Sequence, residues 1–143
     1  MTDLSAKRPS GCPVAFGLDT FGDRWTLLII REMLLGGKKT YGAFLEAEEG
    51  ISTNILANRL KQLEADGLVE KRRDPENFRS FLYDLTDKGY ALAPVLFAII
   101  RWSGRYDSRP DRLTGMVERL AQDEAGLLAE IEARRQRDRA QTA

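Results

Sequence analysis

Hydrophobic residues recur every three or four positions along most of this chain, which is the spacing of amphipathic helices. Before residue 50 this spacing predicts three short helices. The first begins at Pro13, because proline suits a first helical position, and Gly22 ends it. The second is capped by Asp23 and closed by Gly36-Gly37, and the third covers residues 42–47.

A longer helix that begins after Ser52 divides most clearly into two sides. Serine is a strong N-cap residue, and the Glu48-Glu49-Gly50 run before it is typical of a tight turn. Apolar residues form one side of the helix, namely Leu56, Leu60 and Leu63. The opposite side carries Thr53, Asn54, Ala57, Asn58 and Lys61. We therefore expect one side to pack and the other to be free for recognition.

Alternation of apolar and polar residues replaces the helical spacing after Gly67. Residues 68–73 and 80–85 predict two antiparallel strands, and residues 74–77 supply the turn. Basic side chains cluster in this hairpin: Lys71, Arg72, Arg73 and Arg79.

Helical spacing returns after Thr86, which caps a predicted helix over residues 87–106. Pro94 must kink or reset this helix, because proline removes an internal hydrogen bond. Its predicted apolar side consists of Leu92, Val95, Ile99, Trp102 and Tyr106. A last helix over residues 111–139 has an apolar side that Glu124 interrupts, formed by Leu113, Val117, Leu120, Leu127 and Ile131.

A short helix, a tight turn, a capped amphipathic helix and a basic hairpin follow one another in the order of a winged helix-turn-helix. Considered alone, the helix after Ser52 is typical of a simple surface helix, and only the order of the elements favours DNA binding. The predicted fold is mainly α with a small β-hairpin wing and extra N- and C-terminal helices. We expect a flexible tail over residues 1–11, the DNA-binding domain over 12–109 and a C-terminal helix over 110–143.

Side chains that both donate and accept hydrogen bonds suit the edges of bases, and asparagine matches the paired donor and acceptor of adenine. The expected contacts in the major groove are Ser52, Thr53, Asn54, Asn58 and Lys61. The expected contacts with the DNA backbone or from the wing are Lys38, Lys39, Arg59, Lys71, Arg72, Arg73 and Arg79.

Two of these backbone assignments have an alternative. Arg59 lies beside the apolar side of its helix, so an internal ion pair with an acidic neighbour is as good an interpretation as a DNA contact. The charges of the wing are also typical of a strand edge that resists aggregation.

Composition narrows the classes of function. The 22 basic residues balance 22 acidic ones, so local clustering and not total charge supports DNA binding. The chain has no histidine, one cysteine and no glycine-rich phosphate loop after a strand, so we expect neither an enzyme nor a metal or cofactor site. Its apolar runs are far shorter than the roughly 20 residues that span a bilayer.

Cys12 is the single cysteine, so no internal disulfide forms, and a reducing cytosol suits the chain. No secretory signal is evident before it, and we expect a cytoplasmic protein. A position at a helix N-terminus favours the thiolate and raises reactivity, although a small buried residue is an equally simple interpretation. The large aromatic residues are expected in the core: Phe16, Trp25, Phe97, Trp102 and Tyr106.

Several motifs in fixed order resemble the HxlR-type regulators, a group of MarR-related bacterial repressors and activators. The motifs are Cys12-Pro13-Val14, Trp25-Thr26-Leu27-Leu28-Ile29, Gly50-Ile51-Ser52, Arg59-Leu60, Leu63-Glu64-Ala65-Asp66-Gly67-Leu68 and Leu85-Thr86-Asp87-Lys88-Gly89. The resemblance covers roughly residues 12–106. It departs from the family in the wing, where Phe78-Arg79-Ser80 replaces the usual Pro-Pro-Arg.

The resemblance implies a homodimer whose N-terminal segment and C-terminal helices form the interface. In several such regulators the cysteine at the position of Cys12 senses quinones, aldehydes or oxidants, by alkylation or by a disulfide between subunits. The leading hypothesis is therefore a homodimeric regulator that binds an inverted repeat in double-stranded DNA and responds to an electrophile or oxidant through Cys12.

Two alternatives remain open. In the first, a noncovalent aromatic effector binds between the Phe16–Trp25 region and the Phe97–Trp102 helix. In the second, the winged-helix fold is a protein-interaction module that uses the last helix and does not bind DNA.

Overall fold

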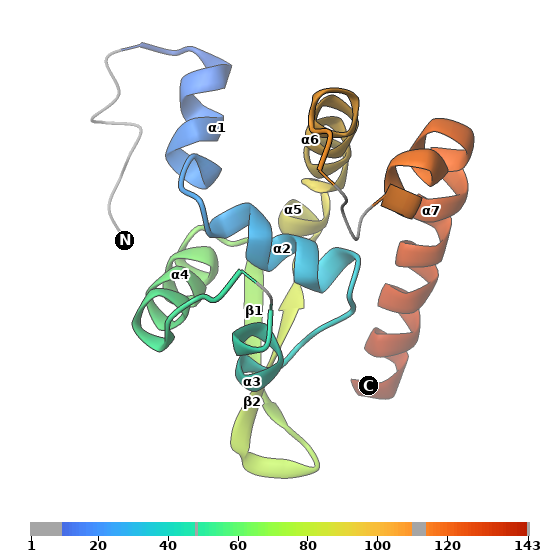
Figure 1. Ribbon diagram of the computed structural model, residues 1–143. Coiled ribbons are helices and arrows are strands. Elements are labelled where there is room, and N and C mark those ends of the chain that lie inside the picture. Colours follow the sequence, from blue (N-terminus) through green and yellow to red (C-terminus); the bar gives the residue numbers. More distant parts are fainter. Residues whose placement is uncertain (1–9, 48, 110–113, 143) are drawn as a thin grey trace. The chain divides into compact units, whose positions relative to one another are not determined.

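The computed structural model describes residues 10–47, 49–109 and 114–142. The chain forms two compact units, Met1–Tyr90 and Ala91–Ala143. The first contains α1 (Pro13–Phe21), α2 (Thr26–Leu34), α3 (Tyr41–Leu45), α4 (Thr53–Ala65), β1 (Val69–Asp74), β2 (Asn77–Leu85) and α5 (Asp87–Tyr90). The second contains α6 (Ala93–Tyr106) and α7 (Thr114–Thr142). The predicted fold, mainly helical with one antiparallel hairpin, is confirmed (Figure 1).

Proline and carboxylate caps define the first two helices. Pro13 occupies the first turn of α1, and Gly22 follows its last residue, as predicted. The α2 helix starts later than expected, at Thr26, because residues 24 and 25 form a turn. Asp23 still caps the helix from three residues before its first residue. Its Oδ2 accepts hydrogen bonds from the backbone N of Trp25 at 2.9 Å and of Thr26 at 3.0 Å.

The α4 helix forms as its sequence predicts. The Oγ of Ser52 accepts a hydrogen bond from the backbone N of Ile55 at 3.2 Å, which satisfies one free amide of the first turn. The apolar side of the helix is completely buried, with Leu56, Leu60 and Leu63 each at most 3% exposed. Gly67 follows with a positive φ of 74°, a conformation that glycine adopts without strain.

The hairpin packs at its base and extends away from α2, α3 and α4, as Figure 1 shows. Val69 pairs with Leu85 at the base, where Val69 is buried. The loop between α2 and α3 contacts β2, because the backbone N of Tyr83 donates a hydrogen bond to the carbonyl oxygen of Lys39 at 2.8 Å. Gly89 of α5 lies against this base, since a Cβ there would meet the backbone oxygen of Leu68 at 2.1 Å.

The single helix expected over residues 87–106 is two helices. The α5 helix ends at Tyr90, and α6 begins at Ala93 with Pro94 in its first turn. Of the two outcomes expected for Pro94, the structure shows a reset, because proline has no amide hydrogen to continue the earlier helix. The compact units accordingly divide at residue 90, and the functional division at residue 109 stays a prediction.

The prediction of which side of α6 packs inward is wrong. Ile99, Trp102 and Tyr106 are 43%, 67% and 66% exposed, while the buried residues are Ala93, Leu96, Phe97 and Ile100. Residues 93–100 are apolar on nearly every side of the helix, so spacing alone does not select the face that packs. The prediction that Phe97 lies in the core is confirmed. The same prediction is wrong for Phe16, which is 50% exposed, and Trp25 is half-buried.

The α7 helix is interrupted where the apolar pattern is interrupted. Asp123 has non-helical φ and ψ of −155° and 66°, and its Oδ1 accepts a hydrogen bond from the backbone N of Gly126 at 2.9 Å, as a new N-cap. Glu124 forms an ion pair with Arg101 of α6 at 2.5 Å. Three residues of the predicted apolar side, Leu120, Leu127 and Ile131, are buried as expected, whereas Leu113 lies outside the described residues.

Candidate nucleic-acid interface

The outer side of α4 presents every residue expected to contact bases. Ser52, Thr53, Asn54, Asn58 and Lys61 are all exposed, opposite the buried leucines of the same helix. A helix held by one side and polar on the other is what insertion into a major groove requires.

Two residues that the sequence analysis did not identify stabilise α3 and its connection to α4. The phenolic oxygen of Tyr41 donates a hydrogen bond to the carbonyl oxygen of Thr53 at 2.9 Å and so ties α3 to the first turn of α4. The Oγ1 of Thr40 caps α3 by accepting from the backbone N of Ala43 at 3.1 Å. Thr40 is detectable in the sequence as a capping residue before a short helix, but nothing local marks the role of Tyr41.

Arg59 makes the internal ion pair that was one of its two interpretations. Its Nη1 lies 3.6 Å from Oδ1 of Asp23, which follows α1. Its Nε and Nη2 donate to Oδ1 of Asn58 at 3.2 and 2.6 Å, so Arg59 also orients a residue expected to contact bases. A direct contact between Arg59 and DNA remains a prediction.

Asp23 is held in its charged form. Partial burial opposes ionisation, but hydrogen bonds from Thr26 and from the backbone N of Trp25, together with the charge of Arg59, outweigh it. The pKa of Asp23 therefore lies below its ordinary value.

The basic residues of the wing are divided between the two faces of the hairpin, as strand alternation requires. Lys71 and Arg73 share a face with Phe81, with Nζ of Lys71 4.1 Å and Cζ of Arg73 4.9 Å from the ring centroid. Arg72 is on the other face, where its Nε lies 2.6 Å from Oδ2 of Asp84.

Two further cations expected on the DNA backbone have carboxylate partners. Lys39 shares Asp84 with Arg72, its Nζ lying 3.2 Å from Oδ1. Lys38 lies 2.7 Å from Oε2 of Glu32. Within the part of the chain that the structure describes, Lys71, Arg73 and Arg79 have no carboxylate within ion-pair distance, so the wing offers these three cations most readily.

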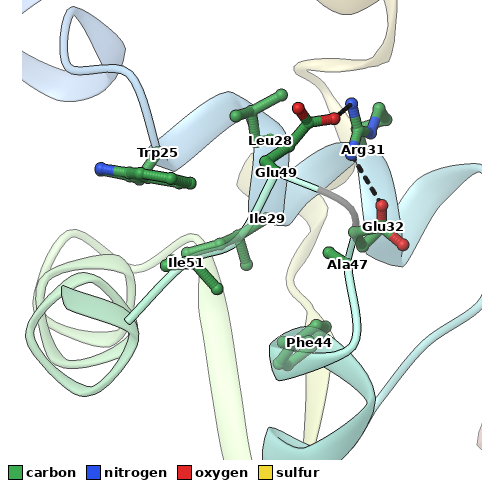
Figure 2. Close-up of a pocket in the computed structure, with 9 residues that line it drawn as sticks. All are labelled: Trp25, Leu28, Ile29, Arg31, Glu32, Phe44, Ala47, Glu49 and Ile51. Carbon is green, nitrogen blue, oxygen red and sulfur yellow. Dashed lines mark hydrogen bonds and ion pairs between the residues drawn. The ribbon is translucent and has the colours of Figure 1, made fainter. Parts of the chain in front are cut away.

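A shallow apolar hollow lies beside the start of the α4 segment (Figure 2). It is open to solvent and is lined by Trp25, Leu28, Ile29, Arg31, Glu32, Phe44, Ala47, Glu49 and Ile51. Arg31 closes one side by pairing with Glu32 at 2.8 Å and with Glu49 at 3.0 Å. The enclosed space of the hollow is no larger than about one water molecule, so we assign no ligand to it.

Cys12 is exposed and is the N-cap residue of α1. Its carbonyl oxygen accepts a hydrogen bond from the backbone N of Phe16 at 3.1 Å, which places the thiol at the helix N-terminus. The interpretation of Cys12 as a buried residue is therefore wrong.

No group of three or more potential metal ligands occurs among the residues with described positions. No helix in the same part of the chain combines the length and the hydrophobicity needed to cross a membrane.

A family model described as HxlR-like helix-turn-helix matches residues 20–111. The uncharacterised HTH-type transcriptional regulator sll1512 of Synechocystis sp. is 36% identical over 88 residues, which are 62% of this chain and 64% of that protein. The HTH-type transcriptional regulator YodB of Bacillus subtilis is 38% identical over 92 residues, which are 64% of this chain and 80% of YodB.

Solved structures agree with these matches. The redox regulator HypR in its oxidised form is 30% identical with a TM-score of 0.59, over 70% of this chain and 99% of HypR. The reduced form of the transcriptional regulator YodB is 33% identical with a TM-score of 0.56, over 71% of this chain and 100% of YodB.

Proposed function

This chain belongs to the HxlR-like helix-turn-helix family of DNA-binding transcriptional regulators, and from that premise we propose that it binds an inverted-repeat operator as a homodimer. The observation that carries the proposal is the exposed polar side of α4 opposite its buried leucines. In this proposal α4 enters the major groove and contacts bases through Ser52, Thr53, Asn54, Asn58 and Lys61.

The DNA backbone is held mainly by the wing. Lys71, Arg73 and Arg79 are exposed and are not engaged by carboxylates of the described chain. Lys38, Lys39 and Arg72 already share part of their charge with carboxylates, so we expect a smaller net contribution from them. Arg59 acts through Asn58, whose side chain it orients.

Exposed apolar side chains on each unit support the dimer. In the first unit they lie on α1, where Val14 and Leu18 are 69% and 58% exposed. In the second they lie on α6, at Trp102 and Tyr106, whose ring centroids are 5.4 Å apart. On α7, Leu120, Leu127 and Ile131 are already buried within the chain, so the support comes from α1 and α6. A two-fold dimer places two copies of α4 on half-sites about one helical turn apart, or a multiple of it.

Cys12 supplies the response to oxidants or electrophiles. Its thiol is exposed, it lies at the start of α1, and HypR, similar in fold and sequence, is a redox regulator. Modification at this position changes the placement of α1 in the dimer and thereby the spacing of the two α4 helices. The noncovalent alternative requires a response that persists without the thiol.

Binding selection tests the DNA-binding proposal directly. The protein is incubated with a random-sequence duplex library, and fluorescence anisotropy compares a recovered duplex with its scrambled form. We expect the recovered sequence to contain two inverted half-sites and to bind at least tenfold more tightly, since specific binding exceeds non-specific binding by about 10³–10⁷. Equal affinity for both duplexes, or sedimentation of the complex with one protein chain, would contradict the proposal.

A further inference from the structure

The tip of the wing carries one large exposed apolar side chain. Phe78 is 70% exposed and lies at the end of the hairpin, which extends beyond α2, α3 and α4 of its own unit (Figure 1). A single exposed apolar residue is ordinary on a protein surface, so its surroundings decide whether it has a role.

The strand register places Phe78 in a bulge. Arg73 pairs with Phe81, but the next residue, Asp74, pairs with Asn77, so residues 78–80 have no partners across the hairpin. A bulge of this kind bends the strand and redirects its side chains.

Hydrogen bonds hold the bulge in one conformation. The Nη1 of Arg73 donates to the carbonyl oxygen of Phe78. The Oδ1 of Asn77 accepts from the backbone N of Arg79 at 3.2 Å, and its Nδ2 donates to Oγ of Ser80 at 3.1 Å. Side-chain hydrogen bonds therefore hold the backbone on both sides of Phe78.

Exposed cations neighbour Phe78 on the hairpin. Arg73 donates a hydrogen bond to the carbonyl oxygen of Phe78, Arg79 follows Phe78 in the chain, and Lys71 is exposed further along β1. The hairpin also carries four carboxylates, Glu70, Asp74, Glu76 and Asp84, of which Asp84 is paired with Arg72. An apolar ring among cations is complementary to the minor groove of DNA, where apolar side chains enter between base pairs and cations meet a concentrated negative potential.

We propose that Phe78 is a wedge that enters the minor groove beside the α4 half-site and kinks the duplex, while Lys71, Arg73 and Arg79 face the phosphates. The inference rests on the proposed function, since it needs α4 in the adjacent major groove. It makes the wing selective for steps that unstack easily, which are pyrimidine–purine steps, without any hydrogen bond to a base.

The test measures DNA shape and not only affinity. A duplex recovered by binding selection carries a fluorescent donor and acceptor at its ends, and a second copy carries 2-aminopurine at the step expected to meet the wing. We expect the wild type to kink the duplex by about 20–90° and to raise 2-aminopurine fluorescence. Phe78→Ala should still bind but lose both signals, whereas Phe78→Leu should keep both, because leucine is also a wedge residue.

Each result decides the matter. Equal bending by the wild type and Phe78→Ala, or binding by the wild type without bending, overturns the wedge and leaves the proposed function intact. Absence of binding to any duplex at low salt overturns the proposed function and the wedge with it. Thermal melting of each free variant, expected to match the wild type because Phe78 is exposed, shows that a lost signal does not come from unfolding.

Discussion

The guanidinium of Arg59 lies 3.6 Å from the carboxylate of Asp23 and at the same time donates to the side chain of Asn58. Asp23 also caps α2, so one carboxylate connects the junction of α1 and α2 with the DNA-facing side of α4. We expect a displacement of α1 to reach Asn58, a residue proposed to contact bases, through Asp23 and Arg59. We therefore predict that modification of Cys12, at the start of α1, acts on DNA recognition through this connection.

Asp23→Asn tests this connection. Asparagine keeps an oxygen that can cap α2 but removes the charge that holds Arg59, so we expect weaker discrimination between the selected and scrambled duplexes. Asp23→Ala should also lose about 0.5–2 kcal/mol of stability, because the cap is removed. Fluorescence anisotropy and chemical denaturation measure the two effects, and unchanged discrimination in both variants would break the proposed connection.

The same carboxylate predicts a dependence on pH. The pKa of Asp23 is lower in the folded state than its ordinary value, so ionised Asp23 stabilises the fold at pH values above that ordinary value. The contribution is lost as pH falls through the folded-state pKa. The stability difference between the wild type and Asp23→Asn should therefore shrink between pH 6 and pH 3 in denaturation experiments.

Replacing Asn54 or Asn58 by alanine should reduce sequence preference by about 1–3 kcal/mol for each base contact that is lost. The reason is that the methyl group of alanine cannot reproduce the paired donor and acceptor of the amide. The measurement is the ratio of affinities for the selected and scrambled duplexes. Gln62→Ala is the matched control, since Gln62 is exposed on α4 outside the proposed contact set. If both asparagine variants behave like this control, the proposed DNA-facing side of α4 is wrong.

The wing should account for part of the salt dependence. Lys71→Gln and Arg79→Gln should each lower the slope of log affinity against log salt by about 1, as expected when one phosphate is no longer neutralised. Arg72→Gln should change it less, because Arg72 is paired with Asp84. A larger effect from Arg72 than from Lys71 would mean that the ion pair opens on DNA.

Cys12→Ser should abolish the response to oxidants. Since Cys12 is the single cysteine, a change in DNA affinity after treatment with diamide or a quinone is assignable to it when the variant shows none. Recovery with dithiothreitol separates a disulfide between subunits from alkylation. A full response in Cys12→Ser would favour the noncovalent effector instead.

Gly89→Ala should destabilise the first unit, because a Cβ at this position would overlap the backbone oxygen of Leu68. Overpacking of this kind typically costs about 1–3 kcal/mol. Gly42→Ala is the control, since nothing lies within 4 Å of a Cβ there, and alanine in a helix is about 1 kcal/mol more favourable than glycine. Equal melting temperatures for the two variants would show that the close approach of α5 to Leu68 is absent in solution.

The elements that position the site were predictable because their causes act between neighbours in the chain. Ser52 caps α4 through an amide three residues away, and the leucines that bury one side follow helical spacing. The hairpin follows from alternation and from turn residues at its centre. The exposed polar side of α4 is then a geometric consequence of the helix.

The hydrophobic pattern did not determine which side of α6 packs or where α7 is interrupted. Residues 93–100 are apolar on almost every side, so the exposure of Ile99 and Trp102 was not predictable from spacing. The break in α7 had a visible sign in the interrupted apolar pattern, but its place at Asp123 depends on a local cap that competes with a continuous helix.

The sequence was therefore sufficient for the helix-turn-helix, its wing and the polar side of α4, but not for the availability of each charge. Arg72 is bound to Asp84, 12 residues away, and Arg59 to Asp23 across the first unit, while Lys71 and Arg73 meet a phenyl ring instead. The energy of an ion pair depends on the distance and the medium between two side chains. For residues far apart in the chain, packing sets both, and no pattern of neighbours records them.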